Sequence, residues 1–381
     1  MKAKAFKIFL KEKIKMLHVY HHNDLDGRAA AYVVHKYKPS SAVDSILTYH
    51  EISDHDAKYD KHTINGVIKD DVVIVDLGVN ENTLQNLLDA CKTARTVTFI
   101  DHHQSSLDVI NNHKKELQAI ENLTYFVSVG ICGSALAYCY FNIPTEDLKN
   151  IRATMENEYY HIDAKSSGFS KVTVTGTKYG KREDKKDNFK TPFMIKDFTL
   201  PLWLAHVDDY DCWKQLNNAT DAFVLGTDVE DTRMIIENDY ENYEFNPFWE
   251  RLDSLESCLE YITNGRLIAK YINARYSREL KYTFEWEFNG TKFICKNAPG
   301  NSWNFGRLLT QYDAAILFKY DGSVGKWTYS VYAHDKSDFN CTEFCKMFGG
   351  GGHFHASGFS TTTPIFTDPN LLEKLSNESK N

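Results

Sequence analysis

Four short runs of mainly hydrophobic residues each end in a cluster of acidic or histidine side chains. The runs cover residues 17–20, 72–75, 96–100 and 203–207. Each is short and rich in β-branched or aromatic residues, which predicts a strand. Amphipathic helical patterns follow the first three runs, at 28–36, 82–91 and 134–141. Strands that alternate with helices predict βαβ units and a largely parallel sheet covered on both faces.

Residues 163–195 interrupt this pattern. Positions 172–180 alternate in polarity like a hairpin, and positions 181–187 form a run of mixed charge. Because a charge run is usually solvated, the segment is predicted to be a surface insertion. A basic lip for a nucleic-acid backbone stays open as the alternative.

The second half of the chain changes character. Apolar residues recur at helical spacing between 247 and 280, which predicts one long helix. Beyond it, alternating runs predict strands at 282–288, 292–295, 314–320 and 326–333, and helical patterns lie near 305–309 and 341–347. The predicted class is α/β, with a largely parallel-sheet first domain, a long linker helix and a smaller mixed-sheet C-terminal domain. The predicted boundaries are 1–15 for a basic N-terminal extension, 16–245 for the first domain, 246–280 for the linker helix and 281–381 for the second domain.

Composition and charge narrow the class of protein. Hydrophobic residues make up 42% of the 381 residues and charged residues 25%, as in folded globular proteins. No apolar run approaches the roughly 18 residues of a membrane span, and the net charge of −8 excludes a basic coat for nucleic acid. The eight cysteines include no C-x-x-C pair. We therefore expect reduced cysteines, a cytoplasmic protein without a membrane partner, and no structural zinc site.

The polar clusters after the predicted strands carry the candidate chemistry. The carboxyl ends of parallel strands meet at one edge of a sheet, where α/β proteins bind their ligands. A single carboxylate there could be a helix N-cap, but four clusters in the same place argue against that explanation for all of them. The candidate metal ligands are His22, Asp24, Asp26, Asp76, His102 and either Asp208 or Asp209. Carboxylates and imidazoles without a thiolate favour Mn²⁺, Mg²⁺ or Fe²⁺, and so many ligands favour two ions.

These residues resemble the motifs of a known family. The resemblance rests on Asn-Asp-Leu-Asp-Gly at 23–27, Asp76, Asp-His-His at 101–103 and Asp-Asp-Tyr-Asp at 208–211. In order and spacing they are similar to the four motifs of the DHH phosphoesterase superfamily. The glycine-rich run at 349–359 resembles the signature of that family's C-terminal substrate domain. The resemblance spans roughly residues 16–365.

The resemblance implies a phosphodiesterase with two Mn²⁺ ions, for which Mg²⁺ is the alternative, bound by the first domain. By position, the matching metal ligands are Asp24, Asp26, Asp76 and His102. In the fourth motif Asp209 aligns better and Asp208 stays open. The family's opening histidine falls on Tyr20, so His22 is the choice for that ligand and His21 stays open.

The resemblance also implies roles for further residues. Asp76 is the expected bridge between the ions, and a bridging hydroxide is the hypothesised nucleophile. His103 is expected either to orient a ligand or phosphate, to protonate the leaving oxygen, or to be a buried histidine bonded to a carboxylate. In the second domain the glycines can present backbone N–H groups to an anion. The predicted substrate-binding residues of this loop are Gly350, Gly351, Gly352 and His353. The arginine that the family often carries before the loop is absent, because Tyr332 and Ala333 occupy that region. Arg307 or a lysine is therefore the further predicted phosphate-binding residue.

The expected activity is hydrolysis of short oligonucleotides to mononucleotides. Cyclic or linear dinucleotides, or nucleotide phosphates, are the alternative substrates. A RecJ-like exonuclease needs an extra nucleic-acid-binding domain with stacking aromatics, for which 381 residues leave no room. The alternative of another class is a nucleotide-binding protein with the same fold and no turnover, whose mark would be lost ligands. A homodimer stays open.

Overall fold

The computed structural model describes residues 15–38, 45–53, 69–144, 159–181, 188–237, 243–299, 311–334 and 337–366. The chain divides into two compact units, residues 1–266 and 267–381. The division falls inside the segment predicted as a linker helix, while the roles assigned to the two domains stay predictions.

In its described part, unit 1 is built on a five-stranded sheet with the order β2-β1-β3-β4-β5. Every pair of neighbours in it is parallel, as the sequence predicted. The chain therefore changes direction across the sheet between β1 and β3, the kind of position where open α/β sheets bind ligands. The strands are β1 (Met16–His22), β2 (Ile46–Ile52), β3 (Asp71–Val75), β4 (Thr96–Asp101) and β5 (Leu123–Val127).

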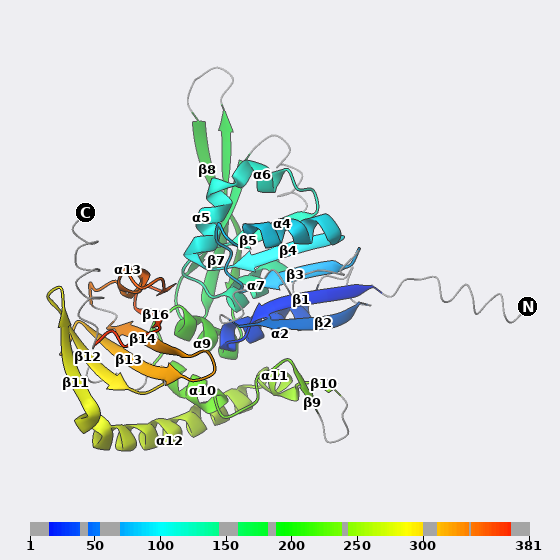
Figure 1. The fold of residues 1–381 in the computed structure, drawn as a ribbon. Helices are drawn as coiled ribbons and strands as arrows, with labels where there is room; N and C mark the ends of the chain where they lie inside the picture. Colours follow the sequence, from blue (N-terminus) through cyan, green and yellow to red (C-terminus); the bar gives the residue numbers. More distant parts are fainter. Residues whose placement is uncertain are drawn as a thin grey trace, which may run out of the picture. The chain divides into compact units, whose positions relative to one another are not determined.

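The first three predicted helices are confirmed and lie on both faces of this sheet (Figure 1). Alternate residues of each strand point to opposite faces, so Val73 packs with α2 and α7 whereas Val72 packs with α4 and α5. The sequence patterns do not predict the edge strands β2 and β5, because half-exposed positions blur their alternation. The helices are α2 (Leu25–Tyr37), α4 (Leu84–Thr93), α5 (Gln104–Asn112), α6 (Lys114–Gln118) and α7 (Gly133–Phe141).

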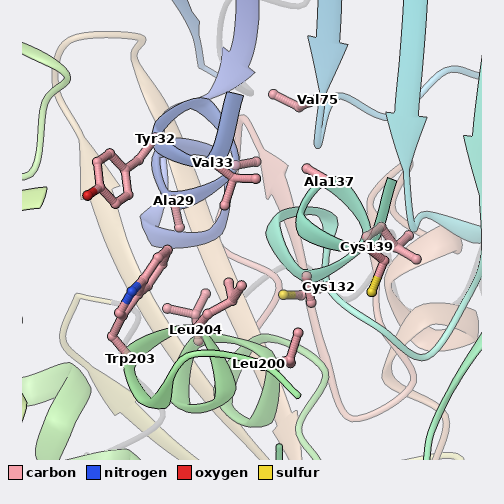
Figure 2. Close-up of a cluster of buried hydrophobic side chains, with 14 of the residues drawn as sticks. Ala29, Tyr32, Val33, Val75, Cys132, Ala137, Cys139, Leu200, Trp203 and Leu204 are labelled. Atoms are coloured by element: carbon pink, nitrogen blue, oxygen red, sulfur yellow. The ribbon is translucent and has the colours of Figure 1, made fainter. Parts of the chain in front are cut away.

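The larger core of unit 1 lies where α2, α7 and α9 (Leu202–Asp211) meet (Figure 2). Small residues such as Ala29 and Ala137 let the helices approach, and Trp203 fills the space between α9 and α2. Each of these side chains is fully buried or nearly so. Burying a large apolar side chain contributes about 1.5–3 kcal/mol, so this core holds the three helices together.

The prediction of a strand at 203–207 is wrong, because these residues belong to helix α9. All residues from Trp203 to Asp209 are buried, and a helix buried all round shows a continuous apolar run instead of a 3.6-residue period. A short run of that kind cannot be told from a buried strand by its pattern. The helix begins after Pro201, whose fixed φ suits a helix start.

Residues 163–195 fall in a three-stranded antiparallel sheet in the order β6-β7-β8. The hairpin alternation at 172–180 is confirmed, since β7 pairs along its length with both neighbours. The inner end is core, however, with Ala164, Val172, Val174 and Phe198 all buried. The charged residues 182–187 lie outside the described residues. The strands are β6 (Tyr159–Ser166), β7 (Lys171–Lys181) and β8 (Asn188–Thr199).

The predicted helix 247–280 is two helices, α11 (Pro247–Arg251) and α12 (Leu255–Glu279). Leu252 turns inward and is buried, and backbone turns at 253 and 254 separate the helices. The apolar stripe that predicted one helix is only partly buried, because Leu255, Leu259, Leu267 and Tyr271 are exposed. Unit 1 also contains α10 (Thr220–Thr227), β9 (Ile235–Glu237) and β10 (Tyr243–Phe245).

Unit 2 contains a mixed sheet of six strands in its described part, in the order β11-β12-β13-β14-β16-β15. Only β12 and β13 are parallel among these neighbours. Aromatic residues of the sheet, such as Phe293, pack against Phe344 of α13. The elements are β11 (Thr283–Phe288), β12 (Thr291–Asn297), β13 (Ala314–Asp321), β14 (Lys326–Ala333), α13 (Cys341–Lys346), β15 (Gly351–Gly352) and β16 (Ala356–Thr361).

The four strands and the helix predicted at 341–347 are thus confirmed. The helix predicted near 305–309 and the basic stretch 1–14 lie outside the described residues. Among the helices that the structure describes, none has both the length and the apolar character needed to cross a bilayer.

Gly226 of α10 and Gly265 of α12 let these two helices touch through their backbones in unit 1. A Cβ on Gly265 would lie 1.6 Å from the carbonyl oxygen of Ala222. Replacing Gly265 with alanine should therefore force the helices apart and lower the free energy of unfolding by about 1–3 kcal/mol. Denaturant unfolding measures this change. The control is Asn264→Ala, an exposed position of the same helix that should stay within about 0.5 kcal/mol; equal effects of the two changes would contradict this packing.

Candidate metal centre

The predicted ligands of the first three motifs gather at one edge of the parallel sheet. His22 ends β1, Asp76 directly follows β3, and His102 directly follows β4. Because these strands are neighbours and parallel, their carboxyl ends meet at the same edge. The arrangement predicted from the spacing of these motifs is therefore present.

At one end of the cluster His22 faces Asp24. The Nδ1 atom of His22 lies 2.8 Å from Oδ2 of Asp24, and both residues offer ligand atoms within 4.8 Å of one on Asp76. The other oxygen of Asp24, Oδ1, accepts a hydrogen bond from the N–H of Gly27 and so caps α2. His21 is buried and its Nδ1 contacts the carbonyl oxygen of His22 at 2.8 Å. Between the two histidines left open by the sequence, the geometry favours His22.

Asp76 occupies the centre of the cluster. Its backbone φ is +53°, a left-handed conformation that aspartate adopts rarely and mostly at turns and functional sites. The side chain is buried, and its Oδ1 has no hydrogen-bond partner although Nε2 of His102 lies 3.1 Å away. A buried carboxylate oxygen without a donor is costly, unless a cation satisfies it.

Asp26 is held by the N-terminus of α7. One oxygen accepts a hydrogen bond from the N–H of Gly133 at 2.7 Å, and the other accepts from the N–H and the hydroxyl of Ser134. The positive end of the helix dipole stabilises the carboxylate there. This approach requires glycine, since a Cβ on Gly133 would lie 2.7 Å from Cβ of Asp76.

At the other end of the cluster His102 meets the C-terminus of α9. The Nε2 atom of His102 lies 3.5 Å from Oδ2 of Asp211 and 3.9 Å from Oδ2 of Asp26. His102, Asp211 and Cys212 together offer ligand atoms within 4.8 Å of one another. Asp211 and Cys212 were not among the predicted ligands.

The structure therefore favours a different residue of the fourth motif from the two predicted. Asp208 pairs with Lys214 at 2.6 Å and accepts a hydrogen bond from the N–H of Cys132. Asp209 accepts hydrogen bonds from two backbone N–H groups and from the hydroxyl of Thr220. Asp211, in contrast, is directed at His102.

The difference follows from the secondary structure of the fourth motif. In a strand, alternate residues share a face, whereas in a helix residues three apart do. The helical period therefore separates Asp211 from Asp209, and a helical interpretation of 203–211 would have made Asp211 a candidate. No sequence signal marks Cys212, because its place in the site depends on where α9 ends.

His103 is oriented by a buried carboxylate. Its Nδ1 lies 2.8 Å from Oδ1 of Asp101, which is fully buried. Burial lowers the pKa of His103, but the carboxylate of Asp101 outweighs this effect and raises the pKa of His103 to about 9. For Asp101, burial raises the pKa, but His103 outweighs this effect and lowers the pKa of Asp101 to about 2. His103 is therefore a cation at neutral pH in this structure, placed beside Asp76 and His102.

The cluster carries an excess of buried negative charge. Burial and then the neighbouring carboxylate of Asp26 raise the pKa of Asp76 well above its usual range. Burial raises the pKa of Asp211 to about 7. Burial lowers the pKa of His102, but Asp211 and Asp76 outweigh it and raise that pKa well above its usual range. A divalent cation binds favourably among such carboxylates, because its charge offsets their mutual repulsion.

The residues present thus fit a metal site. The donors are carboxylates and imidazoles with one thiol, one buried oxygen is unsatisfied, and neighbouring carboxylates repel one another. The candidate ligands form two groups. One consists of His22, Asp24 and Asp76, and the other of His102, Asp211 and Cys212. The groups meet where Oδ1 of Asp76 lies 3.1 Å from Nε2 of His102. This donor set can hold Mn²⁺ or Mg²⁺.

The glycine-rich loop lies in unit 2. The N–H groups of Gly349, Gly350 and His353 donate to backbone carbonyls, so they are not directed at an anion. A Cβ on Gly350 would lie 2.1 Å from the carbonyl oxygen of Gly358, so close strand packing requires this glycine. The substrate-binding roles of Gly350, Gly351, Gly352 and His353 stay predictions, and Arg307 lies outside the described residues.

The contact between α7 and the two aspartates gives a test of the site. Replacing Gly133 with alanine should push Asp76 and Asp26 away from α7 and lower the affinity for Mn²⁺ by at least about tenfold. Calorimetric titration of the metal-free protein measures the affinity, and circular dichroism reports the fold. Gly322→Ala is the control, because a Cβ there meets nothing within 4 Å. Unchanged Mn²⁺ affinity in Gly133→Ala would contradict the placement of the site.

No protein-family model matches this chain. In sequence it is 24% identical over 356 residues to oligoribonuclease NrnB of Bacillus subtilis (strain 168), and the alignment covers 92% of this chain and 74% of that protein.

Two solved structures are similar at low scores. The first is the pGpG-specific phosphodiesterase PggH from Vibrio cholerae, with a TM-score of 0.39 and 12% identity; the alignment covers 95% of this chain and 99% of that one. The second is RecJ from Thermus thermophilus in complex with Mn²⁺, with a TM-score of 0.44 and 13% identity; the alignment covers 100% of this chain and 54% of that one. Neither score is high enough to assign a fold or a function. In its ordered motifs and the parallel sheet that gathers them, the chain resembles the DHH phosphoesterase superfamily, and in sequence it is similar to NrnB along most of its length.

Proposed function

We propose that this protein is a metal-dependent phosphodiesterase that hydrolyses short oligonucleotides to mononucleotides, with two Mn²⁺ ions as the preferred cofactor. The observation that carries the proposal is the buried cluster around Asp76, whose Oδ1 lacks a hydrogen-bond donor between two groups of metal-ligating side chains. Similarity to an oligoribonuclease over 92% of the chain supports the choice of substrate.

The proposed ligands divide between the two ends of the cluster. His22 and Asp24 serve one ion, His102, Asp26 and Asp211 serve the other, and Asp76 is shared between them. A pair of divalent cations supplies an activated water and neutralises charge on a phosphodiester. The N-terminus of α7 holds the Asp26 carboxylate in place through hydrogen bonds from two backbone N–H groups.

His103 is the proposed proton donor to the leaving oxygen. Asp101 binds its Nδ1, which fixes the ring and leaves Nε2 as the atom that can reach a substrate. The raised pKa means that the imidazole carries the proton at neutral pH. The side chain is 36% exposed, whereas those of His102 and Asp76 are nearly fully buried, so His103 is the accessible member of the three.

The activity is tested by single-turnover cleavage of end-labelled RNAs, from dinucleotides to about twenty nucleotides, and of cyclic dinucleotides, with Mn²⁺ added. Mononucleotides should appear fastest from the shortest RNAs, and Asp76→Asn should abolish cleavage because both ions lose a ligand. Preferred cleavage of cyclic or linear dinucleotides would select the alternative substrate. Binding of nucleotide without cleavage of any substrate would contradict the proposal and favour a non-catalytic role.

A second prediction separates the aspartates of the fourth motif. Asp211→Asn should lower Mn²⁺ affinity by at least about tenfold and remove most of the hydrolysis, because Asp211 faces His102. The matched control, Asp209→Asn, weakens the acceptor of two backbone N–H groups and should mainly lower the thermal midpoint. Loss of metal affinity in Asp209→Asn with retention in Asp211→Asn would reverse the assignment.

A further inference from the structure

Cys212 differs from the other cysteines of the chain. All eight lie in the described ranges, and Cys212 alone is partly exposed while the remaining seven are buried. It follows α9 directly as the residue that ends this helix. The thiol is thus brought to the sheet edge by the same helix end that carries Asp211.

The thiol of Cys212 lies among candidate metal ligands. Sγ of Cys212 lies 4.0 Å from Oδ2 of Asp211, and Cys212, Asp211 and His102 offer ligand atoms that all lie within 4.8 Å. A second observation is independent of the thiol: Oδ1 of Asp76 is buried without a hydrogen-bond donor, 3.1 Å from Nε2 of His102. With Asp76 the donors at this end include one sulfur, one nitrogen and two carboxylates.

We propose that Cys212 is a thiolate ligand at the His102 and Asp211 end of the centre and gives this end a preference for thiophilic cations such as Zn²⁺ and Co²⁺. The inference rests on the proposed function, since it uses the same ligands. On binding, the Sγ–H bond breaks, a bond from Sγ to the cation forms, and the proton passes to solvent, with no change in oxidation state.

The thiolate makes the two ends chemically unequal. Carboxylates and imidazoles suit Mn²⁺ and Mg²⁺, whereas thiolate ligands select softer ions and Zn²⁺ prefers about four donors. The His22 and Asp24 end has no cysteine in its group, so it keeps the preference for Mn²⁺. Zn²⁺ is therefore expected to displace Mn²⁺ at one end only.

Cys132 is the nearest competitor for this role and serves as the matched control. It is fully buried, and its Sγ contacts the hydroxyl of Ser134 at 3.1 Å, on the side of Asp26. It is not a member of any candidate ligand group in the described residues. Replacing either cysteine with alanine removes one thiol from the neighbourhood, so the pair distinguishes ligation from proximity.

The test is titration of the metal-free full chain with Co²⁺ while the near-ultraviolet absorption is recorded, where a thiolate–Co²⁺ bond gives a charge-transfer band. Wild type and Cys132→Ala should show the band, and Cys212→Ala should lose it while still binding Mn²⁺ within a few-fold of wild type. Zn²⁺ affinity, from competition with Mn²⁺, should fall by at least about tenfold in Cys212→Ala only.

The outcomes separate this inference from the proposed function. Co²⁺ binding without the band in wild type, or the band retained in Cys212→Ala, overturns the role of Cys212 and leaves the phosphodiesterase proposal intact. Absence of any Co²⁺ or Mn²⁺ binding in wild type overturns both. Mn²⁺-dependent cleavage of short RNA by wild type, measured in parallel, shows whether the proposed function stands by itself.

Discussion

Repulsion among carboxylates gathered at one sheet edge is the interaction on which the rest of unit 1 depends. Asp24, Asp26, Asp76 and Asp211 converge there, and burial and mutual repulsion raise the pKa of Asp76 and of Asp211. Such a cluster destabilises a fold unless positive partners are built around it. The neighbouring elements are arranged to provide those partners, and what they leave unsatisfied defines the place for a cation.

The compensation comes from specific backbone and side-chain groups. The N-terminus of α7 binds Asp26, the first turn of α2 binds Asp24, and His102 faces Asp76 and Asp211. The acidic end of α9 is unfavourable for a helix C-terminus, and Lys214 offsets it at Asp208. Among these four aspartates of the described residues, Asp76 keeps a buried oxygen without a hydrogen-bond donor, which makes it the natural point of attachment for a metal ion.

Much of unit 1 could be predicted because its signals are local. Strands β1, β3 and β4 and the residues that follow them are read directly from short apolar runs, so His22, Asp76 and His102 were placed correctly together. Helix α9 could not be recognised, because a helix buried all round has no amphipathic period. Because α9 was predicted as a strand, Asp211 and Cys212 were not among the candidate ligands; their contacts depend on where the helix ends. For the glycine-rich loop the motif is clear in the sequence, but most of its N–H groups donate to backbone carbonyls of the same unit.

The central claim is that Asp76 joins two metal positions of unequal chemistry. The most direct measurement is a crystal structure of the Mn²⁺-loaded protein with anomalous scattering at the manganese edge. The account predicts two anomalous peaks, one beside His22 and Asp24 and the other beside His102 and Asp211, both in contact with the carboxylate of Asp76. A single peak, or peaks away from Asp76, would contradict it.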